Sequence, residues 1–271
     1  MKSFPAFGIL FGSRGQAPQL RKLLMENSNL PGPRGNLELA HSFARAIAGM
    51  HIDDWQWDFL MEMARTSAAN APVNTPGEFL PFCALLALGA LYGDGLPRPR
   101  RRTALAALIS SASDTRWRVR EGVAMGLQLI GERDLPALRA IVTDWLPKAS
   151  WLEMRAIAAG LAHPPILGDA EFAVFSVDTA RIILAALTRA DAKARKTEAF
   201  KILRQGMGYC VSVFTAHSPA EGFTLMRKSA AVHDSDMAWI ISENLKKKRL
   251  SAPYPEDVKK VQIILEEARA R

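Results

Sequence analysis

Apolar residues recur at intervals of three and four along most of the chain, the spacing that lines one face of an α-helix. The pattern is interrupted by LPGPRG at 30–35 and again around Pro97 and Pro99, where proline and glycine favour loops. Asp53 and Thr75 stand where their side chains can cap the helices that follow. No segment alternates apolar and polar residues with period two, so the sequence predicts an all-α protein. Helices are expected at about 17–25, 36–48, 53–68, from 76 through the apolar run 79–92, and at 100–112, 115–131, 135–146, 150–162, 171–189, 193–214, 219–231, 236–248 and 255–270.

One stretch, residues 105–131, indicates how these helices are organised. It reads LAALISSASDTRWRVREGVAMGLQLIG: a helix, a polar turn ending at Asp114, and a second helix opening with Val119 and Arg120. The start of this second helix recurs in weaker form as Met154-Arg155, 35 residues after Arg120. Such a unit cannot bury its apolar face alone and must stack on neighbours.

A third copy lies near the C-terminus. Asp236-x-x-Trp239 repeats Asp114-x-x-Trp117 at an offset of 122 residues, which fits about three repeats of about 40 residues. Thirteen or so helices would form about six pairs. We therefore expect a single domain over residues 1–271, built as a right-handed α-solenoid of helical hairpins.

The charge distribution suggests an alternative organisation, with an N-terminal layer at 1–94 and a basic repeat array at 95–271. Residues 1–94 contain 7 Lys and Arg against 8 Asp and Glu, and residues 95–271 contain 28 against 19, so the two parts carry −1 and +9. The isoelectric point is about 9.7. Such a basic excess favours a polyanionic partner such as DNA or RNA.

Composition and the longest apolar run favour a soluble protein with no membrane partner. Hydrophobic residues make up 49% of the chain and charged residues 23%. The run 79–92 contains Pro81 and Gly89 and falls short of the roughly 20 residues that span a bilayer, so it is interpreted as a buried helix. The apolar start, KSFPAFGILF, is too short for a secretory signal and no cleavage site follows, so a cytoplasmic location is expected. Cys83 and Cys210 lie in separate helical patterns and are expected to be buried thiols.

The repeat unit resembles the HEAT family, whose pattern L-x-x-L, a turn with Asp, then V-R-x-x-x-A, is present as Leu105, Leu108, Asp114, Val119, Arg120 and Ala124. Longer stretches, LPGPRGNLELA, RWRVREGVAMGLQ, GYCVSVFTA and AWIISENLKKKRL, resemble bacterial HEAT-like repeat proteins allied to the DNA alkylation repair glycosylases.

This resemblance implies a helical solenoid whose second helices line a concave face, which holds DNA in the glycosylase members. It also implies, for an enzyme, a tryptophan pair, an aspartate one helical turn from a tryptophan, and an arginine. The chain departs from that set. Trp55 and Asp58 lie a turn apart but in the weakly charged N-terminal part, and Trp145 stands beside Asp144. No catalytic residue is therefore named.

The densest candidate binding cluster is Arg116, Trp117, Arg118 and Arg120. Arg116 and Arg120 share one helix face, where their guanidiniums could contact phosphates beside a tryptophan available for stacking. Alternatively, the arginines pair with Asp residues in a ladder that joins one repeat to the next, as is common in HEAT repeats. Further candidates are Trp151, Arg155 and Trp239 in the later copies, and two basic runs, Arg98, Arg100, Arg101, Arg102 and Lys246, Lys247, Lys248, Arg249.

Residue patterns that would indicate an enzyme are missing from the sequence. The five histidines, at 41, 51, 163, 217 and 233, lack the spacing of a zinc site, and Gly12-Ser-Arg-Gly15 is too short for a phosphate loop. No serine nucleophile elbow or Cys/His pair is present. No metal or other cofactor is expected.

Three functions remain open: a non-catalytic scaffold that binds a protein or peptide in its concave groove, a nucleic-acid-binding protein, and a DNA glycosylase acting on alkylated bases. Arginines at 116, 120 and 155 facing a common groove without acidic partners would favour nucleic acid. Arginines fully paired between repeats would favour the protein scaffold.

Overall fold

The computed structural model describes residues 7–93 and 95–270, and every regular element in them is a helix. The all-α prediction is confirmed. The start of the chain through residue 6, which was weighed above as part of a leader, lies outside the described residues, as do 94 and 271. The chain divides into two compact units, residues 1–138 and 139–271.

The N-terminal unit contains seven complete α-helices in its described part: α1 (Phe7–Gly12), α2 (Ala17–Glu26), α3 (Leu37–Ala48), α4 (Asp54–Ala64), α5 (Phe79–Leu91), α6 (Arg98–Ser111) and α7 (Trp117–Arg133). Short 3-10 turns precede α2 and α5, at Arg14–Gln16 and Pro76–Glu78. Helix α8 (Leu135–Trp145) begins in this unit and ends in the next.

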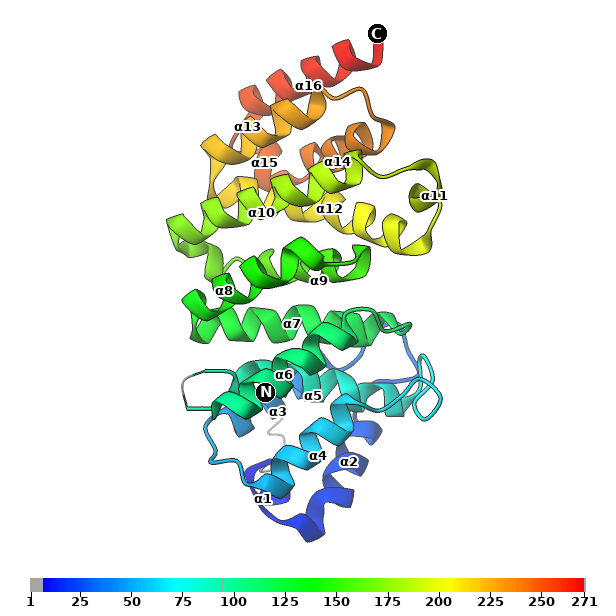
Figure 1. Cartoon of the computed structure of the whole chain (residues 1–271), viewed down its shortest axis with the longest axis vertical. Coiled ribbons are helices and arrows are strands. Elements are labelled where there is room, and N and C mark those ends of the chain that lie inside the picture. The colour runs from blue at the N-terminus through cyan, green and yellow to red at the C-terminus, as the bar shows by residue number, and fades with distance from the viewer. Residues whose placement is uncertain (1–6, 94, 271) are drawn as a thin grey trace. The chain divides into compact units, whose positions relative to one another are not determined.

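Helix α5 forms the core of the N-terminal unit. All of its residues are buried, and it packs against α3, α4 and α7 (Figure 1). Two glycines allow α5 and α7 to approach closely. A Cβ at Gly89 would lie 2.3 Å from the carbonyl oxygen of Gly126, and one at Gly126 would lie 2.8 Å from that of Leu85. The sequence prediction of a buried helix at 79–92 is confirmed, and helices on both sides of residue 94 belong to one unit.

The C-terminal unit contains α9 (Trp151–Leu161), α10 (Ala170–Thr188), α11 (Ala192–Arg195), α12 (Glu198–His217), α13 (Pro219–Ala230), α14 (Ser235–Leu245), α15 (Lys248–Ser251) and α16 (Pro255–Ala270), with 3-10 turns at Leu146–Lys148 and Ile166–Gly168. Helix α12 is central and lies between α9 and α14 (Figure 1). It also packs against α10 and α13, and α13 packs against α16.

A buried asparagine joins α14 to α12. The Oδ1 of Asn244 accepts from the backbone N–H of Ser212 at 2.7 Å, and its Nδ2 donates to the carbonyl of Met207 at 2.9 Å. Asn244 has no exposed surface, so these bonds satisfy polar groups that water cannot reach.

Some helix boundaries were predicted wrongly. Residues 193–214 were expected as one helix, but Asp191 caps α11 and Thr197 begins α12 by accepting from the backbone N–H of Phe200. A side-chain cap favours the start of a new helix, because it satisfies backbone N–H groups that would be paired internally in a continuous helix. The helix expected at 236–248 ends earlier, at Leu245, with α15 beginning at Lys248, and neither α15 nor α1 was expected.

Candidate functional site

Arg116, the first of the predicted binding residues, is buried just before α7, with 2% of its surface exposed. Its Nε and Nη2 donate to the carboxylate of Asp114 at 2.9 and 2.7 Å. Its Nη1 and Nη2 donate to the carbonyls of Ala71 and Thr66 at 3.1 and 2.8 Å. Burial alone would raise the pKa of Asp114, but the hydrogen bonds from Arg116 outweigh it and hold that pKa below its ordinary value. The guanidinium thus ties the start of α7 to the turn after α4.

Arg118, on the first turn of α7, holds two loops of the same unit. Its Nη1 lies 3.0 Å from Oε2 of Glu78, a residue with no exposed surface. Its Nη2 donates to the carbonyl of Gly32 and, at 3.3 Å, to Oδ1 of Asn74. Its guanidinium carbon lies 4.6 Å from the ring centre of Trp117, which is 44% exposed. The Pro/Gly-rich loop at 30–35 is therefore held in part by a residue 86 positions after Gly32.

Arg120 completes this cluster. Its Nη1 donates to the carbonyls of Asp114 and Thr115 at 2.6 and 3.1 Å, and the residue is buried. The guanidiniums of Arg116, Arg118 and Arg120 all face protein atoms of the N-terminal unit. Arg116 pairs with Asp114 of its own turn and Arg118 with Glu78, so a ladder of Asp–Arg pairs between repeats stays a prediction. Trp117 alone presents a large surface to solvent.

The arginines of the basic run at the start of α6 differ in their contacts and exposure. Arg100 donates to the carbonyl of Ile52 and to the carboxylate of Asp54. Arg101 is half-buried, and Arg98 and Arg102 are exposed.

The later candidates converge on α12 in the C-terminal unit. Trp151 and Arg155 lie on α9 and Trp239 on α14, the two helices that flank α12. Two glycines of α12 leave room for them. A Cβ at Gly208 would lie 2.9 Å from Cζ3 of Trp239, and one at Gly206 would lie 3.4 Å from Cγ of Arg155. Trp151 packs edge-on against the first turn of α12. The structure thus brings these three residues around one helix.

An ion-pair network joins α11, α12 and the start of α14. Arg195 lies 2.7 Å from a carboxylate oxygen of Asp234 and 2.6 Å from one of Asp236. The Nε of Arg204 lies 2.6 Å from the other oxygen of Asp236, and its guanidinium carbon lies 4.0 Å from the ring centre of Trp239. Hydrogen bonding to Asp234 raises the pKa of Arg195. Burial would raise the pKa of Asp234, but the bond and charge of Arg195, together with the backbone N–H groups of Met237 and Asp236, outweigh it and lower that pKa.

Beside this network lies a basic and aromatic surface. Tyr209 on α12 is 47% exposed, and Arg249 lies over its ring at 4.6 Å while donating to its hydroxyl at 2.9 Å. The side chains of four exposed lysines of the segments 191–217 and 248–251 form no hydrogen bond or ion pair with the described residues; they are Lys193, Lys196, Lys201 and Lys248. We call the surface of α9, α11, α12, α14 and α15 that carries these residues the basic face.

Most of the excess charge of the C-terminal unit is on this face. Residues 139–271 contain 20 Lys and Arg against 15 Asp and Glu. The segments 151–161, 191–217 and 234–251, which form the basic face, contain 10 against 6, so they carry +4 of the unit's +5. The N-terminal unit contains 15 against 12, a net +3.

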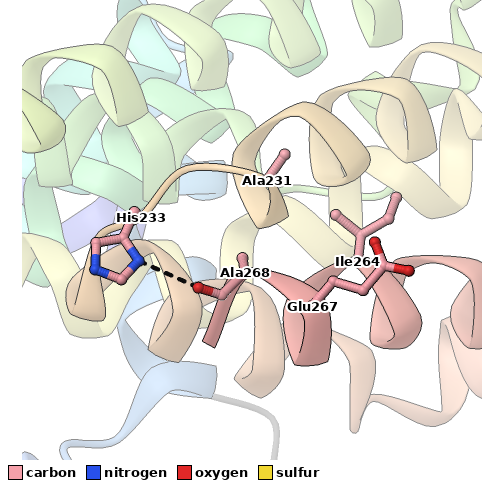
Figure 2. A pocket seen from close by; sticks show the side chains of 5 residues that line it. All are labelled: Ala231, His233, Ile264, Glu267 and Ala268. Carbon is pink, nitrogen blue, oxygen red and sulfur yellow. Dashed lines mark hydrogen bonds between the residues drawn. The ribbon is translucent and has the colours of Figure 1, made fainter. Parts of the chain in front are cut away.

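A small surface pocket lies elsewhere in the C-terminal unit, between the α13–α14 turn and α16 (Figure 2). It encloses about 210 Å³. His233 borders it and donates from Nδ1 to the carbonyl of Ala268 at 3.1 Å. The other residues that line it are Ala231, Ile264, Glu267 and Ala268.

Comparison with models of known protein families and with curated protein sequences finds no match. In residues 7–93 and 95–270, no group of three or more His, Cys, Asp or Glu side chains is arranged to hold a metal ion. None of the helices in the same described ranges combines the length and hydrophobicity that crossing a bilayer requires.

Proposed function

We propose that the protein is a non-catalytic HEAT-like repeat scaffold whose basic face binds an acidic segment of a partner protein. The observation that supports this proposal is the concentration of charge on the basic face, which carries exposed lysines without internal partners and the half-exposed ring of Tyr209. Carboxylates of an extended chain would meet these ammoniums, and the aromatic ring would bury apolar parts of the same chain.

A protein partner fits this face better than a nucleic acid does. Arg204 covers a face of Trp239, and the ring also lies against Gly208, so little of the indole is left for a base to stack on. The guanidiniums of Arg195 and Arg204 form ion pairs with Asp234 and Asp236, although arginine is the residue best suited to bind phosphates. The positively charged side chains of the basic face that have no internal partner, Lys193, Lys196, Lys201 and Lys248, are all lysines. An ammonium group attracts carboxylates without requiring a fixed geometry.

The solenoid arrangement and the kinship with HEAT-like proteins form part of this proposal. Two copies of the D-x-x-W pattern support it, because each has an arginine on its aspartate and an arginine over its indole ring. In such a solenoid, α9, α12 and α14 would be the second helices that line the inner surface.

Nucleic acid is the second candidate, favoured by the net charge of +5 on the unit and by the exposed Tyr209. A glycosylase would in addition need a carboxylate beside aromatic faces on the same surface. The carboxylates of Asp234 and Asp236 are paired with arginines instead.

The experiment is a titration of the full chain against a fluorescent glutamate- and aspartate-rich peptide and against single- and double-stranded DNA, each at two salt concentrations. The test variant is Lys193→Gln, Lys201→Gln, Lys248→Gln. The matched control carries the same charge change on α13 and α16 of the same unit, as Lys228→Gln, Lys259→Gln, Lys260→Gln.

We expect the peptide to bind more tightly than either DNA near physiological salt, and the test variant to weaken it roughly tenfold, as three exposed pairs at a few tenths to 1 kcal/mol each would. The control should bind like the wild type. Equal losses in both variants would contradict a defined basic face. DNA binding that exceeds peptide binding would replace the proposal with the second candidate.

A further inference from the structure

The N-terminal unit contains a cleft that the proposed function does not use. It encloses about 660 Å³ between the segment 14–21 and helix α4. Its wall on the α4 side carries Asp54, Trp55, Asp58 and Glu62, and the opposite wall carries Arg14 and Arg21. The cleft lies wholly within one unit, so its geometry does not depend on the basic face.

Three carboxylates line α4 at intervals of four residues. Asp54, Asp58 and Glu62 therefore lie on one helix face, one turn apart, where like charges repel unless they are neutralised. Arg100 from α6 pairs with Asp54, and Arg21 from α2 pairs with Glu62 at 2.6 Å.

Each of these two arginines also lies over an aromatic ring of α4. The guanidinium carbon of Arg21 lies 4.8 Å from the ring centre of Phe59, and that of Arg100 lies 5.5 Å from the ring centre of Trp57. Helix α4 thus binds a guanidinium twice in the same way, with a carboxylate at its edge and an aromatic ring at its face.

The middle carboxylate has no such cation. Asp58 is exposed, and its side chain forms no hydrogen bond or ion pair with the described residues. Trp55, one turn before it, is half-buried and borders the cleft. The carboxylate and the ring of the repeated arrangement are present at this position, and the space in front of them is open.

We propose that this cleft binds an arginine side chain of a partner protein, with the guanidinium between the Asp58 carboxylate and the Trp55 ring. Arginine fits better than lysine because its planar group can pair with a carboxylate and stack on a ring at once, as Arg21 and Arg100 do. Arg14 on the opposite wall can donate to a main-chain carbonyl of the bound segment. Its positive charge also disfavours a run of several basic residues, so the site selects a single arginine.

The probe is acetyl-Gly-Arg-Gly-amide, compared with the same peptide containing citrulline, which has nearly the same shape without the charge. Binding to the full chain is followed by NMR through the indole N–H signal of Trp55, assigned with Trp55→Phe. The test variant is Asp58→Asn, and the control is Glu266→Gln on α16, another exposed carboxylate without a described partner.

We expect the arginine peptide to shift the Trp55 signal with a midpoint of about 1 mM, and citrulline or Asp58→Asn to weaken binding about tenfold or more. Glu266→Gln should bind like the wild type. Equal binding of the two peptides, an unchanged affinity of Asp58→Asn, or no shift up to about 10 mM would each overturn the proposal. None of these outcomes bears on the basic face, whose lysines lie in the other unit.

Discussion

The guanidinium carbon of Arg204 lies 4.0 Å from the centre of the Trp239 indole ring. The same arginine contacts Asp236, the first residue of the D-x-x-W pattern, through its Nε at 2.6 Å. One side chain from α12 therefore contacts both ends of the pattern on the first turns of α14.

Replacing Arg204 with Met should lower the free energy of unfolding by about 1–2 kcal/mol, because a partly exposed cation–π contact and one side of an ion pair are lost while the stem remains. Asp236 keeps its bond to Arg195, which limits the loss. Urea denaturation of Arg204→Met, Trp239→Leu and the double variant measures the coupling, expected at about 0.5–1 kcal/mol. A coupling of zero would show that the two side chains are adjacent without stabilising each other.

Replacing Arg116 with Met should be far more damaging. The guanidinium is buried, and its loss removes the donor to the carbonyls of Thr66 and Ala71 and the positive charge paired with the Asp114 carboxylate. We expect a loss of about 3–5 kcal/mol in unfolding free energy by urea denaturation. Arg102→Met, at an exposed position of the basic run, is the control and should stay within about 0.5 kcal/mol of wild type. Similar stability in the two variants would refute the structural role of Arg116.

The lowered pKa values of Asp114 and Asp234 predict that stability declines in acid. Between the folded and unfolded pKa values the unfolded chain binds more protons, so this contribution is complete above the ordinary aspartate pKa of about 3.9 and is lost as the pH falls through the folded values. Asp234→Asn should therefore be less stable than wild type at pH 7 and show a flatter decline from about pH 5 downward. Urea denaturation across this range, with Glu266→Gln as the control, provides the measurement. An unchanged slope in Asp234→Asn would contradict the prediction.

Close packing of α5 on α7 predicts a large effect of one methyl group. In Gly89→Ala the new Cβ would meet the carbonyl oxygen of Gly126, a backbone atom that cannot move aside without shifting a helix. The cost should be about 1–3 kcal/mol or more in thermal or urea denaturation. Gly8→Ala, at a helical position where a Cβ meets nothing within 4 Å, is the control and should be neutral or stabilising. If the two variants behave alike, the helices are less closely packed than described.

Most helix positions were predicted correctly from short sequence patterns. The proline and glycine of LPGPRG, the cap at Asp53, and the apolar run at 79–92 indicated a helix break, a helix start and a buried core helix that the structure contains. The cap expected at Thr75 was wrong: its side chain forms no cap hydrogen bond, and a short 3-10 turn follows it. The divided helices at 191–217 were missed because a Thr cap inside a continuous apolar pattern is a weak signal. The three carboxylates of α4 at positions 54, 58 and 62 were also missed, although their spacing of four residues was visible in the sequence.

By itself, the sequence determined that the chain is helical and where most helices lie, because helix formation depends on hydrogen bonds and side-chain periodicity within a few residues. Only the tertiary structure decided what the charged residues do. Arg118 pairs with Glu78, 40 positions away, and Arg195 with Asp236, 41 positions away. Because these partners are distant in the sequence, no local pattern distinguishes an arginine in an internal ion pair from one that is free to contact a ligand. The same physics separates Asp58 from its neighbours on α4: all three carboxylates look alike in the sequence, and folding brings an arginine to only two of them.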